Sequence, residues 1–128
     1  MFDFDHALVT GGAGFIGSHL ADRLLDDCAV TVYDDLSTGS RDNVPDDAAF
    51  IHADVRDDEP LRDAVRAADV VFHEAAQVSV QRSVDDPETS HGINIDPLLT
   101  ILEAARGTDT RVVFASSAAI YGHPQSLP

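Results

Sequence analysis

The chain is organised around the stretch Thr10-Gly11-Gly12-Ala13-Gly14-Phe15-Ile16-Gly17-Ser18-His19-Leu20. The apolar run Ala7-Leu8-Val9 precedes it and is short enough to be a buried strand. After it, apolar residues recur at helical spacing. The local prediction is therefore a strand, a glycine turn and a helix.

Three spaced glycines in this stretch each have a separate physical task. Gly11 lets the chain leave the strand in a tight turn, Gly14 lets the backbone approach a pyrophosphate, and Gly17 lets the helix pack closely. The unpaired N–H groups from Gly14 to Ile16 and the positive end of the helix dipole would face the phosphates. Because glycine turns also occur where nothing binds, this prediction of an anion site needs support from its context.

That support comes from a second β-branched run, Val30-Thr31-Val32-Tyr33-Asp34. Asp34 follows Gly17 by 17 residues, close to the separation at which an acid hydrogen-bonds the ribose 2′-hydroxyl of a dinucleotide. A carboxylate at this position also repels a 2′-phosphate. The predicted cofactor is therefore NAD rather than NADP.

The alternation of elements predicts an α/β fold, with one NAD-binding Rossmann domain over residues 1–128. We expect a doubly wound parallel sheet of about five strands in the order 3-2-1-4-5, with right-handed crossovers and helices on both faces. Strands are predicted over residues 6–10, 29–34, 49–53, 69–73 and 111–115, and helices over 14–26, 61–68 and 88–106. Pro97 predicts either a kink in the last helix or two helices, with Asp96 capping the second.

The charge balance excludes two classes of partner. The chain carries 23 acidic residues against eight arginines, has no lysine, and has a formal net charge of −15. This charge would repel nucleic acid and anionic membrane surfaces, so neither is an expected partner. The acidic, lysine-poor composition resembles that of proteins from salt-loving archaea, and it predicts halophily, the alternative being a merely acidic surface.

Other features of the composition concern location and metals. No apolar run is long enough to span a membrane, and the N-terminus lacks the basic region of a secretory signal, so a cytoplasmic protein is expected. Cys28 is the single cysteine, which excludes an internal disulfide and a thiolate metal cluster. We predict no metal site.

Candidate ligand contacts follow the predicted strands, because ligands of open α/β sheets bind outside the carboxyl ends of the strands. The polar turn over residues 35–40 is predicted to wrap the adenosine half of a dinucleotide, or else to be an ordinary surface loop. Asp54, with Val55, is a candidate for contacting the adenine edge. The alternative for Asp54 is a helix cap, a role that Asp57 or Asp58 with Pro60 fits better.

The segment after the fourth strand contains small residues over 74–80, where backbone would have to approach a ring closely. His73 is either a catalytic base or, as we favour, a histidine whose ring is bonded to nearby backbone. Arg82 lies where a second anionic group could be held, and its alternative is a surface ion pair.

These motifs, in this order, resemble the amino-terminal part of the extended short-chain dehydrogenase/reductase family, the NAD-dependent sugar-nucleotide epimerases and dehydratases. The resemblance rests on residues 10–18, 34–39, 54–55, 73–76, 86–87, 94, 116–117 and 121–122. Within that family, residues 79–87 and 94–96 look most like UDP-glucose or UDP-N-acetylglucosamine 4-epimerases.

The resemblance implies a role for each matched residue. The cofactor set consists of Gly11, Gly14, Phe15, Ile16 and Gly17 at the pyrophosphate, Asp34 and Asp35 at the ribose, Leu36, Ser37, Thr38 and Gly39 on the adenosine side, Asp54 and Val55 at adenine, Ala75, Ala76 and Gln77 along the cofactor, and Asn94 as a hydrogen-bonding support. Ser117, four residues before Tyr121, matches the serine that hydrogen-bonds the reacting sugar hydroxyl, with Ser116 beside it.

The chain also departs from the family pattern. Family members transfer hydride with a tyrosine as general acid/base and a lysine four residues later, and a chain without lysine has no such pair. We therefore expect the NAD-binding portion of a UDP-sugar 4-epimerase or dehydratase, truncated before its substrate region and inactive alone. Alternatives are a stand-alone NAD-binding module that a partner chain could complete, and a purely structural protein whose glycine turn binds nothing.

The resemblance also bears on association. Family members commonly dimerise through helices, and loss of the substrate region would expose apolar side chains here. We expect that surface around Leu98, Leu99, Ile101 and Leu102. A homodimer or a complex with a partner chain is therefore expected.

Overall fold

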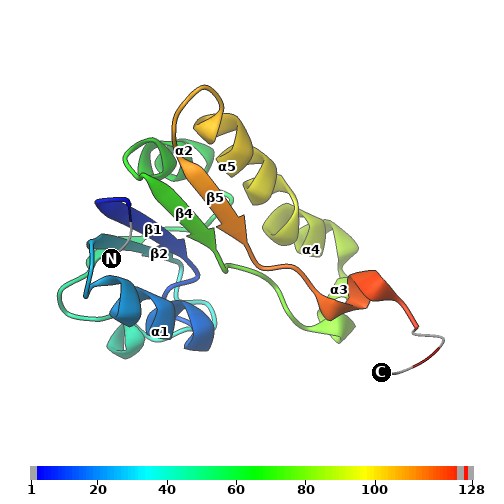
Figure 1. Cartoon of the computed structure of the whole chain (residues 1–128). Helices are drawn as coiled ribbons and strands as arrows, with labels where there is room; N and C mark the ends of the chain where they lie inside the picture. Colours follow the sequence, from blue (N-terminus) through cyan, green and yellow to red (C-terminus); the bar gives the residue numbers. More distant parts are fainter. Residues whose placement is uncertain (1–2, 124–125, 127–128) are drawn as a thin grey trace.

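The structure is a computed structural model that describes residues 3–123 and residue 126. It contains one parallel sheet in the order β3-β2-β1-β4-β5 (Figure 1), which confirms the predicted topology. The strands are β1 (His6–Thr10), β2 (Ala29–Asp34), β3 (Ala49–His52), β4 (Val70–His73) and β5 (Arg111–Phe114). Each lies within one residue of its predicted bounds, because short β-branched runs between turn residues define parallel strands well.

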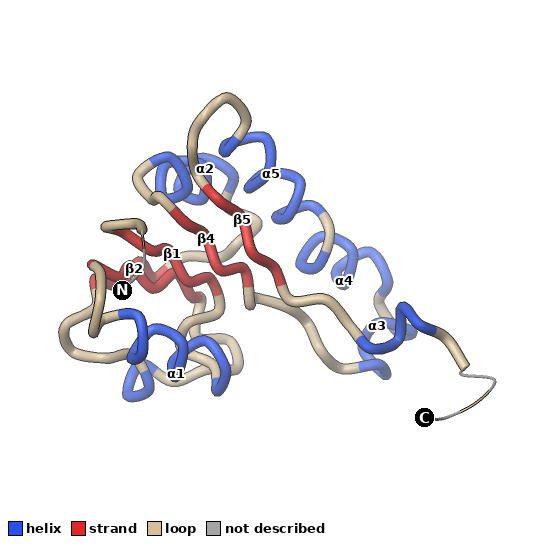
Figure 2. Tube along the Cα trace, viewed as in Figure 1, coloured by secondary structure: helices blue, strands red, loops and turns tan. Residues whose placement is uncertain are grey.

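The helices cover both faces of this sheet, with α1 on one side and α2 and α5 on the other (Figure 1). They are α1 (Phe15–Leu24), α2 (Asp58–Arg66), α3 (Val80–Asp85), α4 (Pro87–Asn94) and α5 (Asp96–Ala105), with 3₁₀ turns η1 (Arg41–Asn43) and η2 (Ala118–Tyr121). Figure 2 shows the short α3 at the end of the long segment that leaves β4. No helix was predicted there, because six residues carry too little periodicity.

The predicted helix over residues 88–106 is two helices. α4 ends at Asn94 and α5 begins at Asp96. Pro97 lies in the first turn of α5, where its missing N–H removes no helical hydrogen bond. The capping residue is Ile95 rather than the predicted Asp96, and its side chain forms no cap. The break reorients the chain without the cost of a proline inside a helix.

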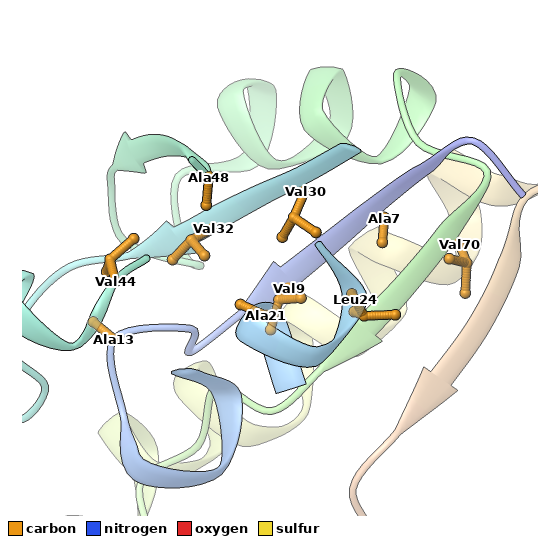
Figure 3. Packing of buried hydrophobic residues seen from close by; sticks show 10 residues of the cluster. All are labelled: Ala7, Val9, Ala13, Ala21, Leu24, Val30, Val32, Val44, Ala48 and Val70. Atoms are coloured by element: carbon orange, nitrogen blue, oxygen red, sulfur yellow. The ribbon is translucent and has the colours of Figure 1, made fainter. Parts of the chain in front are cut away.

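The core forms two apolar clusters, one on each face of the sheet. Consecutive strand residues point to opposite faces, so Val9 joins the cluster under α1 and Leu8 joins the one under α2 and α5. Figure 3 shows the first cluster, in which Ala21 and Leu24 of α1 lie against the valines of β1 and β2. The central strand β1 and its neighbours β2 and β4 are thereby mostly buried.

The prediction of an exposed apolar surface on α5 is only partly correct. Leu99 and Leu102 are exposed and Leu98 is half-buried, but Ile101 is fully buried in the second cluster. Pro97, Ile101 and the alanine at 104 share the helix face that packs on the core, as their spacing requires. None of the helices within residues 3–123 combines the length and the apolar character that crossing a membrane would require.

Candidate functional site

A cleft of about 470 Å³ opens where the strand order reverses, between the carboxyl ends of β1 and β4 and beside β2. Parallel strands gather their loops at this edge, which is where open α/β sheets bind ligands. The predicted cofactor residues that line it are Gly11, Gly14, Phe15, Ile16, Gly17, Asp34, Asp35, Ser37, Thr38, Gly39, Asp54, Val55, Ala75, Ala76 and Gln77. The predicted residues Leu36 and Asn94 do not line the cleft, and neither do Ser116 and Ser117.

Gly11 and Gly17 are required by the packing of the protein itself. Gly11 has φ +69°, and a Cβ there would lie 2.6 Å from the backbone nitrogen of Ala75. A Cβ on Gly17 would overlap the carbonyl oxygen of Gly11. The turn is closed by hydrogen bonds from Gly11 N to Tyr33 O at 2.9 Å and from Gly14 N to Gly11 O at 3.1 Å. These contacts bring the start of α1 against the ends of β2 and β4.

Gly14 is different, because the protein leaves room for a side chain there. A Cβ would meet only the carbonyl oxygen of Gly11, at 3.3 Å. Gly14 is also the N-cap of α1, with no side-chain cap and no acidic residue in the first turn. Within the described part of the chain, the first N–H groups of the helix therefore have no side-chain partner beside the cleft. This arrangement fits an anionic group such as a diphosphate.

Gly12 has a role that the sequence analysis did not assign. A Cβ at this position would lie 2.6 Å from a methyl carbon of Val32, on the neighbouring strand. The absence of a side chain at Gly12 therefore allows the turn to pack closely against Val32 of β2. No spacing rule distinguishes this glycine from its neighbours, because the constraint comes from a residue 20 positions later.

Asp34 lies at the end of β2 with its side chain almost fully buried. Its Oδ2 accepts a hydrogen bond from Ala13 N at 3.0 Å, and its Oδ1 accepts one from Leu36 N at 2.8 Å. The carboxylate is therefore fixed between the glycine turn and the following loop. Each oxygen keeps acceptor capacity for a further donor, such as a ribose hydroxyl.

Leu36 contributes to this site through its backbone rather than its side chain. It adopts φ +59°, an uncommon conformation for a residue with a Cβ. The bond from its N–H to Asp34 stabilises that conformation. Its side chain packs against the core cluster under α1, which explains why it does not line the cleft.

Asp54 follows β3, and both its backbone and its side chain are held by neighbouring residues. Its carbonyl oxygen accepts a hydrogen bond from Tyr33 Oη at 2.9 Å. Burial, followed by the charges of Asp57 and Asp54, raises the pKa of Tyr33 to about 12, so the phenol is a neutral donor. The Asp54 carboxylate pairs with Arg56 at 2.6 Å between Nη2 and Oδ2, and this bond lowers the pKa of Asp54. Asp57, not Asp54, is the N-cap of α2, so the capping alternative for Asp54 is wrong.

Gln77 and Asn94 are joined across the edge of the cleft. Asn94 Oδ1 accepts from Gln77 N at 2.8 Å, and Asn94 Nδ2 donates to Gln77 O at 3.1 Å. The Gln77 side chain donates to Ser90 Oγ at 3.2 Å, and its Oε1 lacks a partner among the described residues. Helix α4 therefore fixes the cleft segment that follows β4.

His73 lies behind the cleft rather than in it. Its Nδ1 shares a hydrogen bond of 2.6 Å with Thr10 Oγ1, which also accepts from Ala75 N at 3.3 Å. The expected bond to backbone is therefore wrong, because the partner is a side chain. Burial lowers the pKa of His73 to about 4, so the ring is neutral at ordinary pH. It links β1 to the segment after β4.

Two further lining residues carry charge. Glu74 is half-buried, and burial raises the pKa of its carboxyl. Arg82 on α3 forms no ion pair within residues 3–123, so the ion-pair alternative gains no support. Its role toward an anionic group stays a prediction.

Ser116 and Ser117 lie on the exposed segment after β5. Ser117 Oγ accepts a hydrogen bond from Ala119 N at 3.1 Å and so caps η2. The structure therefore shows a local backbone role for Ser117. Among the described residues, no group of three or more metal-ligating side chains is placed to hold a metal ion.

Sequence comparison finds related proteins over nearly the whole chain. Residues 7–128 match the model of the NAD dependent epimerase/dehydratase family. A putative UDP-glucose 4-epimerase of Methanocaldococcus jannaschii is 44% identical over 127 residues, which cover 94% of this chain and 41% of that protein. A UDP-glucose 4-epimerase of Streptomyces lividans is 42% identical over 126 residues, covering 94% and 38%.

Solved structures of related proteins have a similar fold. The UDP-glucose 4-epimerase of Brucella ovis in complex with NAD gives a TM-score of 0.87 at 40% identity, covering 97% of this chain and 39% of that one. The UDP-N-acetylglucosamine 4-epimerase of Methanobrevibacter ruminantium M1, in complex with UDP-N-acetylmuramic acid, gives 0.88 at 38% identity, covering 100% and 42%. The chain thus spans about two fifths of the length of these relatives.

Proposed function

The chain belongs to the NAD-dependent epimerase/dehydratase family, and from that premise we propose that it is the NAD-binding portion of a UDP-sugar 4-epimerase. One observation carries the proposal. The Asp34 carboxylate is bonded to Ala13 within the glycine turn, and both segments line one cleft. An acceptor for ribose hydroxyls and an open helix N-terminus for a diphosphate are thus adjacent, as an adenine dinucleotide requires.

The lining supports one orientation of the dinucleotide. The diphosphate would lie at the start of α1 beside Gly14, and the adenosine ribose would lie on Asp34. Adenine would then reach Asp54 and Val55 after β3, and the nicotinamide half would run toward Ala75–Gln77. NAD, when bound, supplies the hydride acceptor of the family's reaction. The residues of this chain bind and orient it.

The sugar nucleotide is a further part of the proposal. Relatives in solved structures are described in complex with UDP-glucose or UDP-N-acetylmuramic acid. We propose a UDP-sugar as the second ligand, with Ser117 and Ser116 near its reacting hydroxyl and Arg82 near an anionic group. These 128 residues contain no lysine and therefore no Tyr-x-x-x-Lys pair. Isomerase turnover by this chain alone is accordingly not expected.

The alternative, an NAD-binding module completed by a partner chain, is favoured by one surface. Strand β5 is an edge of the sheet, and Val113 and Phe114 on it are 42% and 50% exposed. Apolar side chains of α3 and η2 are exposed as well, among them Val84 and Tyr121. Such a surface suits a further polypeptide or a second copy.

Cytoplasmic location and halophily remain predictions from the sequence.

Calorimetric titration in concentrated potassium chloride tests the proposal. We expect saturable binding of NAD with one molecule per chain, and NADP affinity lower by about tenfold or more because of the carboxylate of Asp34. In a separate assay of UDP-galactose conversion, we expect no turnover. Absence of NAD binding to the folded chain would remove the proposed function, and turnover above background would refute the inactivity of the chain alone.

A further inference from the structure

Among the residues that the structure describes, Arg56 is the one that bonds the carboxylate of Asp54. Arg56 Nε lies 3.0 Å from Oδ1 and 3.1 Å from Oδ2, and Nη2 lies 2.6 Å from Oδ2. The backbone N–H of Arg56 also donates to Oδ1 at 2.8 Å. This forked arrangement determines the direction of the carboxylate plane as well as its position.

The side chain of Arg56 also lies near α4. Its Cδ lies 3.9 Å from the point at which Gly92 of α4 would carry a Cβ, so its aliphatic stem runs close to that helix. Arg56 lines both the main cleft and a smaller cavity of about 260 Å³ between the starts of α2 and α5. The aliphatic stem of Arg56 therefore lies beside α4, and its half-exposed guanidinium is held by the bonds to the carboxylate.

The backbone of Asp54 does not depend on this ion pair. Its carbonyl oxygen accepts from Tyr33 Oη at 2.9 Å and from Asp57 N at 2.9 Å. Its N–H donates to Asp57 Oδ2 at 3.2 Å. Removing the guanidinium should therefore leave the carboxylate held only by the backbone N–H of residue 56, so that it can turn about that bond while the loop after β3 keeps its place.

We propose that Arg56 is a positioning residue for base recognition, which aims the Asp54 carboxylate at the six-position of the purine and so makes the cleft select a 6-amino over a 6-oxo base. The inference rests on the proposed function, because it concerns the adenine end of the same cleft. If the Asp54 carboxylate could turn, it would no longer point at the base, and the proposed contact with the purine would weaken.

The chemistry of the two bases explains the expected selectivity. An ionised carboxylate only accepts hydrogen bonds, and adenine offers an amino donor at the six-position. Hypoxanthine offers a carbonyl oxygen there, which a carboxylate repels. An aspartate is ionised at neutral pH, and the hydrogen bond from Arg56 lowers the pKa of Asp54 further. Sites built to bond a particular polar group reject analogues that lack it.

The test compares NAD with nicotinamide hypoxanthine dinucleotide, which differs only at this part of the base. Both are titrated by calorimetry into the wild-type chain and into Arg56→Gln. We expect the wild type to prefer NAD by roughly tenfold and Arg56→Gln to reduce that preference to about twofold, with the affinity for the hypoxanthine analogue changed by less than about twofold. A general loss of structure would instead weaken both ligands together.

Two controls accompany the titration. Arg66→Gln makes the same change of residue on α2, where Arg66 has an exposed contact of 3.5 Å with Asp63 outside the cleft. It should keep the wild-type preference. In an Asp54→Asn background, Arg56→Gln should cause no further loss of preference, because Arg56 acts through Asp54.

The outcomes separate the inference from the proposed function. An unchanged preference in Arg56→Gln, whether or not the affinity for both dinucleotides falls equally, would overturn the inference but not the proposed function. A wild-type chain that binds both dinucleotides equally would also overturn it, since Asp54 would then not read the base. A folded wild-type chain that binds neither would instead remove the proposed function.

Discussion

The side-chain amide of Asn94 forms a pair of hydrogen bonds with the backbone of Gln77, at 2.8 Å and 3.1 Å. The two residues lie on different elements, since Asn94 ends α4 and Gln77 belongs to the cleft segment after β4. An asparagine amide is matched to a peptide group, because it offers one acceptor and one donor side by side. Asn94 thus bonds the backbone of the cleft segment through both its N–H and its C=O, as a neighbouring strand would, although no strand forms there.

Replacing Asn94 with alanine should weaken NAD binding. Loss of the two bonds frees the segment around Gln77, and we expect affinity to fall about five- to tenfold, with unfolding free energy lower by roughly 1–2 kcal/mol. Calorimetry and thermal unfolding measure the two effects. Gln81→Ala, which removes an exposed bond to Asp85 on α3, serves as the control and should leave NAD affinity unchanged. Wild-type affinity in Asn94→Ala would contradict the supporting role of this residue.

Alanine substitution at two glycines should separate folding from binding. Gly11→Ala forces a Cβ to within 2.6 Å of Ala75 N at a φ of +69°, and it should cost roughly 2 kcal/mol or more of stability. Gly14→Ala meets only one atom, at 3.3 Å, so its melting temperature should stay near that of the wild type. NAD affinity should nevertheless fall about tenfold or more, because the methyl group occupies the approach of a diphosphate. Equal effects on stability in both variants would argue against this division.

Replacing Asp34 with asparagine should change the choice between dinucleotides. The substitution removes the negative charge. It also replaces one carboxylate oxygen by an amide N–H₂, which would face the backbone N–H of either Ala13 or Leu36 and could not accept from it. We expect NAD affinity to fall about tenfold, and the ratio of NAD to NADP affinity to fall with it, because repulsion of a 2′-phosphate is lost. Competition titrations give both constants. A ratio that stays constant would mean that Asp34 does not face the ribose.

His73 should make the stability of the protein depend on pH. Burial lowers its pKa from 6.5 to about 4, so the unfolded chain binds more protons between these values than the folded chain. The contribution of the neutral ring is therefore complete above about pH 6.5 and is lost as pH falls toward 4, amounting to at most roughly 3 kcal/mol. Urea titrations of wild type and His73→Asn across this range measure it. The asparagine variant can keep the bond to Thr10 but should lack this part of the pH dependence, and parallel curves would exclude His73 as its source.

Salt should stabilise the chain strongly, as we propose from its composition. A net charge of −15 over 128 residues repels itself at low ionic strength, and molar potassium chloride screens this repulsion beyond roughly 3 Å. The melting temperature should therefore rise from low to molar salt. Asp46→Asn/Asp47→Asn, a variant at two exposed positions, should raise it more at low salt than at high salt. A flat salt series for the wild type would end the halophilic interpretation.

Much of the fold was readable because its signals are local. Each strand is a short β-branched run bounded by turn residues, and the order of the strands follows from the alternation with helices. The boundaries of α2 and the separate α3 were not readable in this way. Acidic residues and Pro60 favour an earlier helix start at Asp58, and the ends of a helix depend on such local competition.

For the candidate site too, some features could be predicted from the sequence and others could not. The glycines and Asp34, in a strand–turn–helix–strand order and at this spacing, predicted a shared site, and the structure places them on one cleft. No spacing rule could assign Arg56 to Asp54 as a forked partner, or predict that Gly12 lies against Val32. Such contacts depend on rotamers and on segments brought together by packing.

The order of residues determined the α/β class, the strand order and the position of the glycine turn, since periodicity and backbone freedom are properties of neighbouring residues. The folded chain decided which of these residues touch, including the pairing of Asn94 with Gln77, the burial of Ile101, and the contact of His73 with Thr10. The physical reason is that a hydrogen bond or a buried contact depends on distances in space, and those are set only when the whole core packs.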